Sequence, residues 1–161
     1  MPFKPDVTVA SIIERDGQFL LIEEHIGRRL VLNQPAGHLE DGETLIDAVV
    51  RETLEESAWH FEPQALVGIY LWKQPDTRRS FLRVAICGTA TRHEPKRRLD
   101  RGIERTLWLP RDQIAVRSAR LRSPMVLRCV DDYLAGARHS LDVLKHMLPF
   151  EENFAPVGTS A

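Results

Sequence analysis

A loop followed by an acidic helix, over residues 34–59, is the stretch that most constrains how this chain can fold. Proline and glycine residues interrupt the first half, so neither a helix nor a strand fits there. The second half predicts a helix that begins after Thr44, because Asp47 follows three residues later at the spacing of a capping box. The loop therefore fixes where the helix starts.

Two apolar stripes run along this predicted helix. Its apolar residues fall into two groups by helical spacing: Leu45, Ala48 and Val49 on one face, and Ile46, Val50 and Leu54 on another. A helix that is apolar on two sides packs on two sides. We therefore expect this helix to lie inside a layered structure.

Three carboxylates continue the first stripe, those of Glu52, Glu55 and Glu56. Such close like charges repel one another, their unpaired burial is costly, and the C-terminal end of a helix disfavours anions. We therefore expect a cation to offset them, and oxygen-only ligands favour Mg²⁺ or Mn²⁺. The alternative is an acidic helix end that faces water, which would be the favoured interpretation of a lone Glu-x-x-Glu-Glu.

The wider pattern resembles the signature of the Nudix hydrolases, G-x5-E-x7-R-E-U-x-E-E-x-G-U, in which U is aliphatic. Gly37, Glu43 and Arg51 occupy specified positions, as do the three glutamates, and such an agreement rarely arises by chance. Thr53 and Ala58 depart from the signature, which has an aliphatic residue and a second glycine there.

Neither departure removes a carboxylate, so we expect the chemistry to survive. The second glycine follows the helix and is expected to adopt a left-handed conformation. Ala58 therefore predicts either a strained positive φ or a different exit from the helix.

The rest of the chain predicts an α/β fold. Runs rich in β-forming residues at 7–13 and 19–22 flank an Asp-Gly turn and predict a hairpin. Further strands are expected at 30–32, 65–72, 80–90 and 106–109.

Helix signals recur near the C-terminal end. Ser123 and Pro124 predict the start of a last helix, which Gly136 ends, and residues 141–148 predict a short amphipathic turn. This order of elements predicts a mixed β-sheet with helices on both faces, in agreement with the α/β/α sandwich that the Nudix resemblance implies. We expect residues 1–148 to form a single Nudix domain and residues 149–161 to form a flexible tail.

Composition and charge argue against several function classes. The 161 residues are 43% hydrophobic with a net charge of −1, which suits one globular domain and gives no field to recruit nucleic acid or an anionic membrane. Six basic residues between 93 and 105 have no interleaved aromatic residue, which favours a solvated loop over a nucleic-acid patch. We expect a small-molecule phosphate as the partner and a monomer, with a dimer as the alternative.

The sequence also favours a cytoplasmic protein. The N-terminus does not resemble a signal peptide, and no apolar run approaches the length that spans a membrane. Cys87 and Cys129 lack metal-binding spacing and are expected to be buried free thiols in a reducing compartment.

Three residues outside the carboxylate cluster are candidates for binding substrate. Arg83 alternates with Phe81 and the small residues that follow it, so it lies either on a solvated face or in a pocket, where arginine suits phosphate recognition. Arg28 lies in a predicted turn, where a solvated side chain is the favoured interpretation. Gln34, at the start of the signature loop, is the third candidate.

Segments outside the signature resemble the NudJ-type Nudix phosphatases over most of residues 3–135. These segments are 3–5, 7–10, 23–24, 33–36 with its continuation into the signature to residue 40, 81–83 and 121–124. The resemblance implies a Mg²⁺-dependent phosphohydrolase that acts on thiamine diphosphate, its hydroxymethylpyrimidine diphosphate precursor, and nucleoside di- and triphosphates, releasing phosphate. A catalytically weak nucleotide-binding module and a plain structural domain are the alternatives, and the intact carboxylates argue against the first.

Roles can be assigned to the residues of the signature. We assign Glu52, Glu55 and Glu56 as metal ligands. The resemblance adds the backbone carbonyl of Ala36 or Gly37 as a ligand, and implies that Arg51 pairs with Glu43 and holds the loop.

The general base is less defined. The resemblance implies a base outside the signature, for which Asp100 and Glu104 are the candidates, with Glu52 as the alternative. Asp100 is preferred, because Gly102 just after it predicts a tight turn that fixes its direction.

Overall fold

The computed structural model describes residues 2–149, so the predicted flexible tail lies almost wholly outside the described residues. The elements follow in the order β1 (Asp6–Ile12), β2 (Glu14–Arg15), β3 (Gln18–Ile26), β4 (Arg29–Asn33), β5 (Ala36–His38), α1 (Leu45–Ser57), β6 (Trp59–Lys73), β7 (Ser80–His93), β8 (Ile103–Pro110), α2 (Arg111–Ala115), η1 (Ser118–Arg120), α3 (Met125–Leu134) and η2 (Leu141–Val143).

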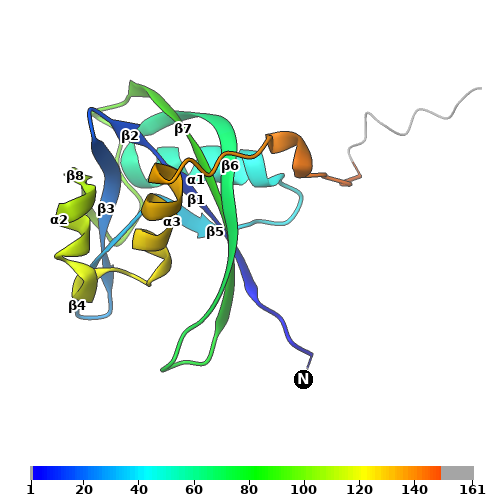
Figure 1. Ribbon diagram of the computed structural model, residues 1–161, viewed down its shortest axis with the longest axis horizontal. Coiled ribbons are helices and arrows are strands. Elements are labelled where there is room, and N and C mark those ends of the chain that lie inside the picture. Colours follow the sequence, from blue (N-terminus) through cyan, green and yellow to red (C-terminus); the bar gives the residue numbers. More distant parts are fainter. Residues whose placement is uncertain (1, 150–161) are drawn as a thin grey trace, which may run out of the picture.

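Two four-stranded sheets form the frame (Figure 1). The first has the order β5-β1-β7-β6 and is mixed, because β1 runs parallel to β7 while β5 and β6 add antiparallel. The second is antiparallel and centres on β3, which pairs with β2, β4 and β8. The predicted mixed sheet is therefore present, and a second, antiparallel sheet accompanies it.

The hairpin predicted from residues 7–13 and 19–22 is wrong in its first strand. The turn at Asp16 and Gly17 forms, with positive φ at both residues, but it joins only the short β2 to β3. β1 instead lies beside β7 in the mixed sheet. β1 is buried from Thr8 to Ile12, and a strand buried on both faces is typical of a sheet interior.

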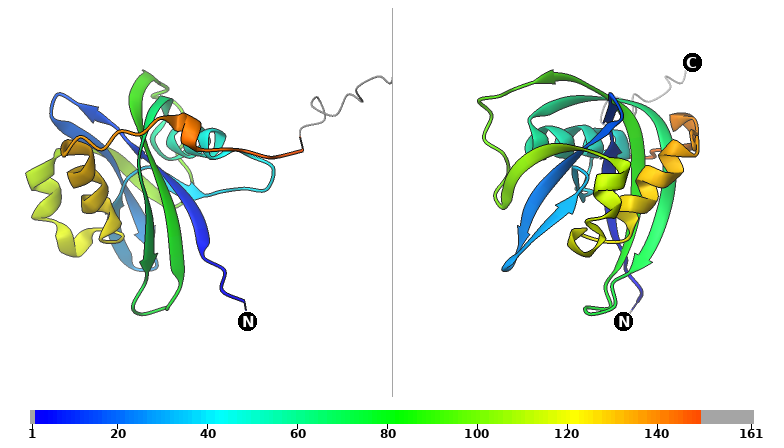
Figure 2. Two further views of the ribbon diagram at one scale, coloured as in Figure 1. Left: turned by 45° about the vertical axis from the view of Figure 1, so that its right-hand side comes forward. Right: turned by 60° about the vertical axis from the view of Figure 1, so that its left-hand side comes forward.

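Helices cover both faces of the mixed sheet (Figure 2). Alternate residues of β7 point to opposite faces: Val84 packs in one core cluster with Val49 of α1, and Ala85 packs in the other with Val126 of α3. The fold is therefore the predicted α/β/α sandwich.

The predicted ends of α1 are confirmed. The Asp47 amide donates to Thr44 Oγ1 at 3.0 Å, and Ala58 follows the helix with a φ of 60°. Ala58 therefore adopts the strained left-handed conformation, and because it is only 3% exposed, burial of its methyl group offsets part of that strain.

The last helix also begins and ends as predicted. The Met125 amide donates to Ser123 Oγ at 3.2 Å, and Gly136 follows α3 with a φ of 92°. The turn predicted over residues 141–148 is realised only as the short η2.

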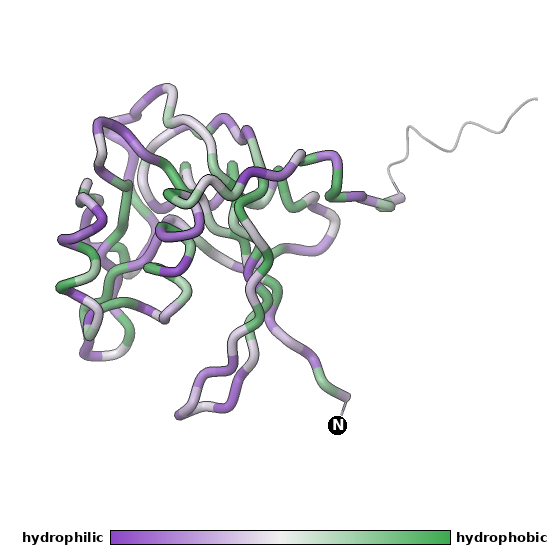
Figure 3. Tube along the Cα trace, viewed as in Figure 1, coloured by the Kyte–Doolittle hydropathy of each residue, from purple (hydrophilic) through white to green (hydrophobic). Residues whose placement is uncertain are grey.

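The β6–β7 hairpin projects from the body of the molecule, and its tip is hydrophilic (Figures 1 and 3). Both strands are longer than predicted, since β6 begins at Trp59 and β7 continues to His93. Among residues 2–149, no helix combines the length and the apolar character that crossing a membrane requires.

Candidate active site

The carboxylates of α1 lie against the backbone of the signature loop. β5 carries Ala36 and Gly37 and packs against α1. A Cβ atom added at Gly37 would overlap the Glu52 carboxylate, so a larger residue there would require the Glu52 side chain to move. The first glycine of the signature therefore makes room for a carboxylate.

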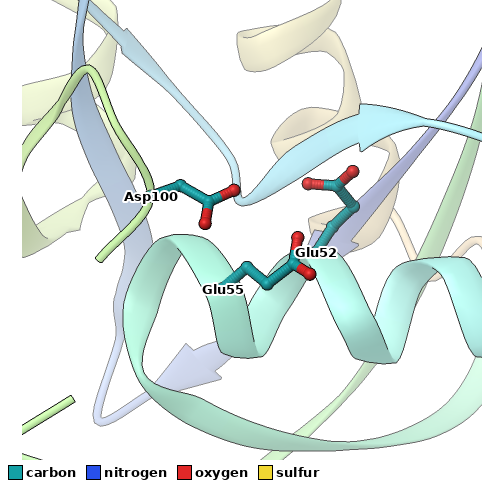
Figure 4. Close-up of side chains that lie close together, drawn as sticks. All are labelled: Glu52, Glu55 and Asp100. Atoms are coloured by element: carbon teal, nitrogen blue, oxygen red, sulfur yellow. The ribbon is translucent and has the colours of Figure 1, made fainter. Parts of the chain in front are cut away.

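Three carboxylates converge at the C-terminal half of α1 (Figure 4). Glu52, Glu55 and Asp100 each offer one oxygen atom, and these atoms lie within 4.8 Å of one another. Asp100 comes from the loop between β7 and β8 and is held there because its amide donates to the Glu55 carbonyl oxygen at 3.0 Å. The structure thus brings Asp100 to two residues that lie 45 and 48 positions earlier in the sequence.

Glu104, the other candidate base, lies elsewhere. Its carboxylate is 2.9 Å from His25 Nε2 in an exposed pair between β8 and β3, and it is not part of the convergent group. Of the two outer acids, only Asp100 lies beside the carboxylates of α1.

Arg51 holds the loop and also reaches the cluster. Its Nε and Nη2 donate to the two carboxylate oxygens of Glu43 at 3.0 and 2.7 Å, and this pairing lowers the pKa of Glu43. Its Nη1 donates to Glu52 and Glu55 at 2.9 and 3.1 Å. The cation expected to offset these carboxylates is therefore in part a guanidinium of the chain itself.

Glu56 sits deeper than its neighbours. Burial raises its pKa to about 9, although the Ala36 amide donates to its Oε2 at 2.9 Å. Burial also raises the pKa of Glu52, against the opposing effect of Arg51. Two buried carboxyl groups so near each other favour a bound cation, and oxygen-only donors fit a hard divalent ion.

A cavity of about 420 Å³ opens beside these residues, a size that suits a small organic molecule. Glu52 and Glu56 line it together with Ala36 and Gly37. Glu52 thus belongs both to the convergent carboxylates and to the cavity wall, so a ligand in the cavity lies next to the cluster.

The three substrate-binding candidates occupy different places. Arg83 is 4% exposed and lines the cavity, so its alternative place on a solvated face is wrong. Gln34 is 1% exposed and lies behind it, where it accepts from Arg83 Nη1 at 2.9 Å and donates to the Val126 carbonyl oxygen. Arg28 is exposed in the turn between β3 and β4 and does not line the cavity.

The sequence did not single out the aromatic part of the cavity. Trp72 of β6 and Phe81 of β7 line it and stack with ring centroids 6.0 Å apart. The alternation that places Arg83 and Phe81 on one face of a strand predicts that Phe81 lies on the same side as Arg83. The partner, Trp72, depends on the register of β6 against β7, which the sequence does not reveal.

Comparisons with known proteins agree with the α/β/α sandwich. A model of the NUDIX domain matches residues 2–128. The chain is 36% identical over 142 residues to the Phosphatase NudJ of Escherichia coli (strain K12), covering 88% of this chain and 92% of that protein. The Phosphatase NudJ of Shigella boydii serotype 4 (strain Sb227) matches with the same identity and coverage.

Solved structures give the same result. A NUDIX hydrolase from Nitrosomonas europaea is 45% identical with a TM-score of 0.87, over 89% of this chain and 97% of that chain. These matches define the chain as a hydrolytic enzyme. The chain belongs to the NUDIX family and is a Nudix hydrolase, an enzyme that acts on phosphorus-containing acid anhydrides.

Proposed function

We propose that this Nudix hydrolase is a Mg²⁺-dependent phosphohydrolase that cleaves phosphoanhydride bonds of small di- and triphosphates and releases phosphate. The observation that carries the proposal is the convergence of Glu52, Glu55 and Asp100 within 4.8 Å, at the edge of a cavity sized for a small molecule. The name of the curated relatives, Phosphatase NudJ, supports phosphate release. The candidate substrates are thiamine diphosphate, hydroxymethylpyrimidine diphosphate and nucleoside di- and triphosphates.

The metal site in this proposal is built from residues of the signature. Glu52, Glu55 and Glu56 hold the ion, with the backbone carbonyl of Ala36 or Gly37 as a further ligand, and Mn²⁺ can substitute for Mg²⁺. When bound, the divalent ion neutralises charge on the phosphate oxygens and makes water a better nucleophile.

The remaining residues position the substrate and move a proton. Asp100 accepts the proton of the attacking water, and Glu52 is the alternative base. Arg51 and Glu43 keep the loop and the carboxylates in place, since they are joined by two hydrogen bonds. Arg83 binds the substrate within the cavity, and Gln34 positions Arg83.

A phosphate-release assay with Mg²⁺ over the candidate substrates tests the proposal. Glu55→Gln and Glu56→Gln should raise the Mg²⁺ concentration needed for half-maximal activity by about tenfold or more, because each removes a proposed ligand. Glu62→Gln, which removes one charge from an exposed position on β6, is the matched control. If no candidate substrate yields phosphate, the proposed activity is wrong; if both variants keep the wild-type Mg²⁺ requirement, the ligand assignment is wrong.

A cytoplasmic location is also part of the proposal. Both cysteines are free and buried, as expected of a protein from a reducing compartment.

A further inference from the structure

A row of polar side chains lines the same cavity as Glu52 and Glu56. Arg83 Nη2 donates to Asn33 Oδ1 at 3.0 Å, and Asn33 Nδ2 faces Glu24 Oε1 at 3.4 Å. Because Arg83 can only donate, the carbonyl end of the Asn33 amide must face it, which leaves the NH₂ end for Glu24. Asn33 is thus held in one orientation, and it holds Glu24 in turn.

Glu24 is a cavity carboxylate that the catalytic proposal does not use. It lines the cavity with Arg83 and Asn33, outside the convergent group of acids. The Glu24 carboxylate makes two polar contacts within residues 2–149, and both are long and involve Oε1. Asn33 Nδ2 lies 3.4 Å from this oxygen and Arg122 Nε lies 3.7 Å from it. Oε2 makes no hydrogen bond within that part of the chain. An ionised carboxylate is an acceptor only, so the group that completes this site must donate hydrogen bonds.

The same cavity contains a flat apolar surface. Trp72 and Phe81 face each other across the β6–β7 pair, one position before its last register pair, and stack with an interplanar angle of 26°. Aromatic faces favour a planar ring, and stacking tolerates any ring identity. Stacking alone therefore selects a flat ring, and an additional polar group is needed to select among rings.

We propose that Glu24 is a specificity-determining residue that accepts a hydrogen bond from an exocyclic amine of the substrate's heteroaromatic ring, while the ring lies against Trp72 and Phe81. This inference rests on the proposed function, since it names the substrate class of the same cavity. The class is a diphosphate or triphosphate whose organic part is an aminated six-membered heteroaromatic ring, alone or fused. A ring with no amine leaves the carboxylate without its donor, and a site built around a hydrogen bond discriminates strongly against a substrate that lacks it.

The test compares substrates that differ by the amine alone. Cytidine diphosphate is paired with the 2-pyrimidinone riboside diphosphate, which lacks only the 4-amino group, and adenosine diphosphate is paired with purine riboside diphosphate. The wild-type enzyme should favour the aminated member by about tenfold or more in kcat/KM in at least one pair, and the pair that responds shows whether one or two rings fit. Glu24→Met, which keeps the length but has no oxygen, should bring that ratio close to 1. Glu24→Gln, which keeps one acceptor oxygen, should give an intermediate ratio.

Two controls separate this inference from the proposed function and from misfolding. Glu62→Met makes the same chemical change at an exposed position of β6 and should keep the wild-type ratio. Calorimetric titration of cytidine and adenosine monophosphates against the monophosphates of 2-pyrimidinone riboside and purine riboside, without metal, should show the same preference in affinity and its loss in Glu24→Met. Equal kcat/KM within both wild-type pairs, or an unchanged ratio in Glu24→Met, overturns the role of Glu24 while leaving the phosphohydrolase proposal intact. Absence of hydrolysis of every diphosphate, with amine-dependent binding retained, overturns the proposed activity instead.

Discussion

Asp100 and Glu104 lie four positions apart in the chain, but only Asp100 lies beside the carboxylates of α1. Both are exposed, and the only local signal that favours Asp100 is the turn predicted at Gly102. The two acids differ in their contacts. The backbone N–H of Asp100 donates a hydrogen bond to the C-terminal end of α1, whereas Glu104 lies in β8 and its side chain pairs with His25. Which of the two acids can act at the carboxylate cluster is therefore decided by the backbone hydrogen bond at Asp100.

This placement gives a prediction for turnover. Asp100→Asn should lower kcat by about 10²–10⁴-fold at saturating Mg²⁺ and substrate, because it removes the proposed proton acceptor. Glu104→Gln, the matched control from the same segment, should keep a near-normal kcat. Measured Mg²⁺ affinity should change little in either variant. A near-normal kcat in Asp100→Asn, together with loss of turnover in Glu52→Gln, would transfer the role of base to Glu52.

At the scale of elements, α1 is fixed to the sheet partly by a polar contact where the signature normally has an aliphatic residue. The Thr53 hydroxyl is fully buried and lies 2.7 Å from the Val49 carbonyl oxygen and 2.9 Å from Ser11 Oγ of β1. Thr53 stands where the signature has an aliphatic residue, and its hydroxyl has a partner on the neighbouring strand, so the two polar groups satisfy each other.

The effects of substituting Thr53 and Ser11 on the free energy of unfolding should not be additive. Thr53→Val should lower the free energy of unfolding by about 1–3 kcal/mol, because it leaves the buried Ser11 hydroxyl without a partner. Ser11→Ala should cost about 0.5–1.5 kcal/mol, and the double variant should be less destabilised than the sum, because no orphaned hydroxyl remains. Denaturant unfolding of the four proteins measures the coupling, and strictly additive changes would contradict a shared hydrogen bond.

The elements also show what the sequence can and cannot predict. The ends of α1 and α3 were predictable because the signals are local: Thr44 caps one helix and Gly136 follows the other. The sheet to which β1 belongs was not predictable, because its run of apolar residues is compatible with a hairpin or with a parallel partner 75 residues away. The same limit applies to the site: the acids of α1 follow from helical spacing, whereas Trp72, Glu24 and Asp100 reach it through tertiary contacts.

At the scale of the whole molecule, one buried carboxylate joins parts that are distant in the chain. Glu23 of β3 has a side chain that is only 4% exposed, and it accepts hydrogen bonds from Arg105 of β8 at 2.7 Å and from Arg120 of η1 at 2.9 Å. The Arg105 hydrogen bond is the main cause that lowers the pKa of Glu23 in the folded protein. The antiparallel sheet and the segment before α3 are therefore linked through one charge.

The lowered pKa of Glu23 sets the sign of a pH effect. The ionised Glu23 side chain stabilises the folded state. This stabilisation is fully present above the ordinary glutamate pKa and is lost as the pH falls through the lower folded-state pKa. Glu23→Gln should lower the melting temperature by about 2–4 °C at neutral pH, and its difference from wild type should shrink as the pH is lowered through the acidic range. Melting curves at a series of pH values measure this, with Glu62→Gln as the control for charge loss. A difference that stays constant down to pH 3 would show that ionisation of Glu23 is not the cause.

Metal binding should also change the stability of the whole molecule. Arg51 already offsets part of the charge of Glu52 and Glu55, so the metal-free protein is expected to fold, and the effect of metal should follow from ligand linkage alone. Mg²⁺ at 100 times its dissociation constant should stabilise the folded state by about 2.7 kcal/mol, which raises the melting temperature by about 5–10 °C for a chain of this size. Melting curves in EDTA and in saturating Mg²⁺ measure the shift. Glu56→Gln should melt with a smaller shift because it lacks a proposed ligand, and Glu62→Gln should keep the full shift. Coincident wild-type curves in EDTA and Mg²⁺ would mean that the carboxylates of α1 do not hold the ion.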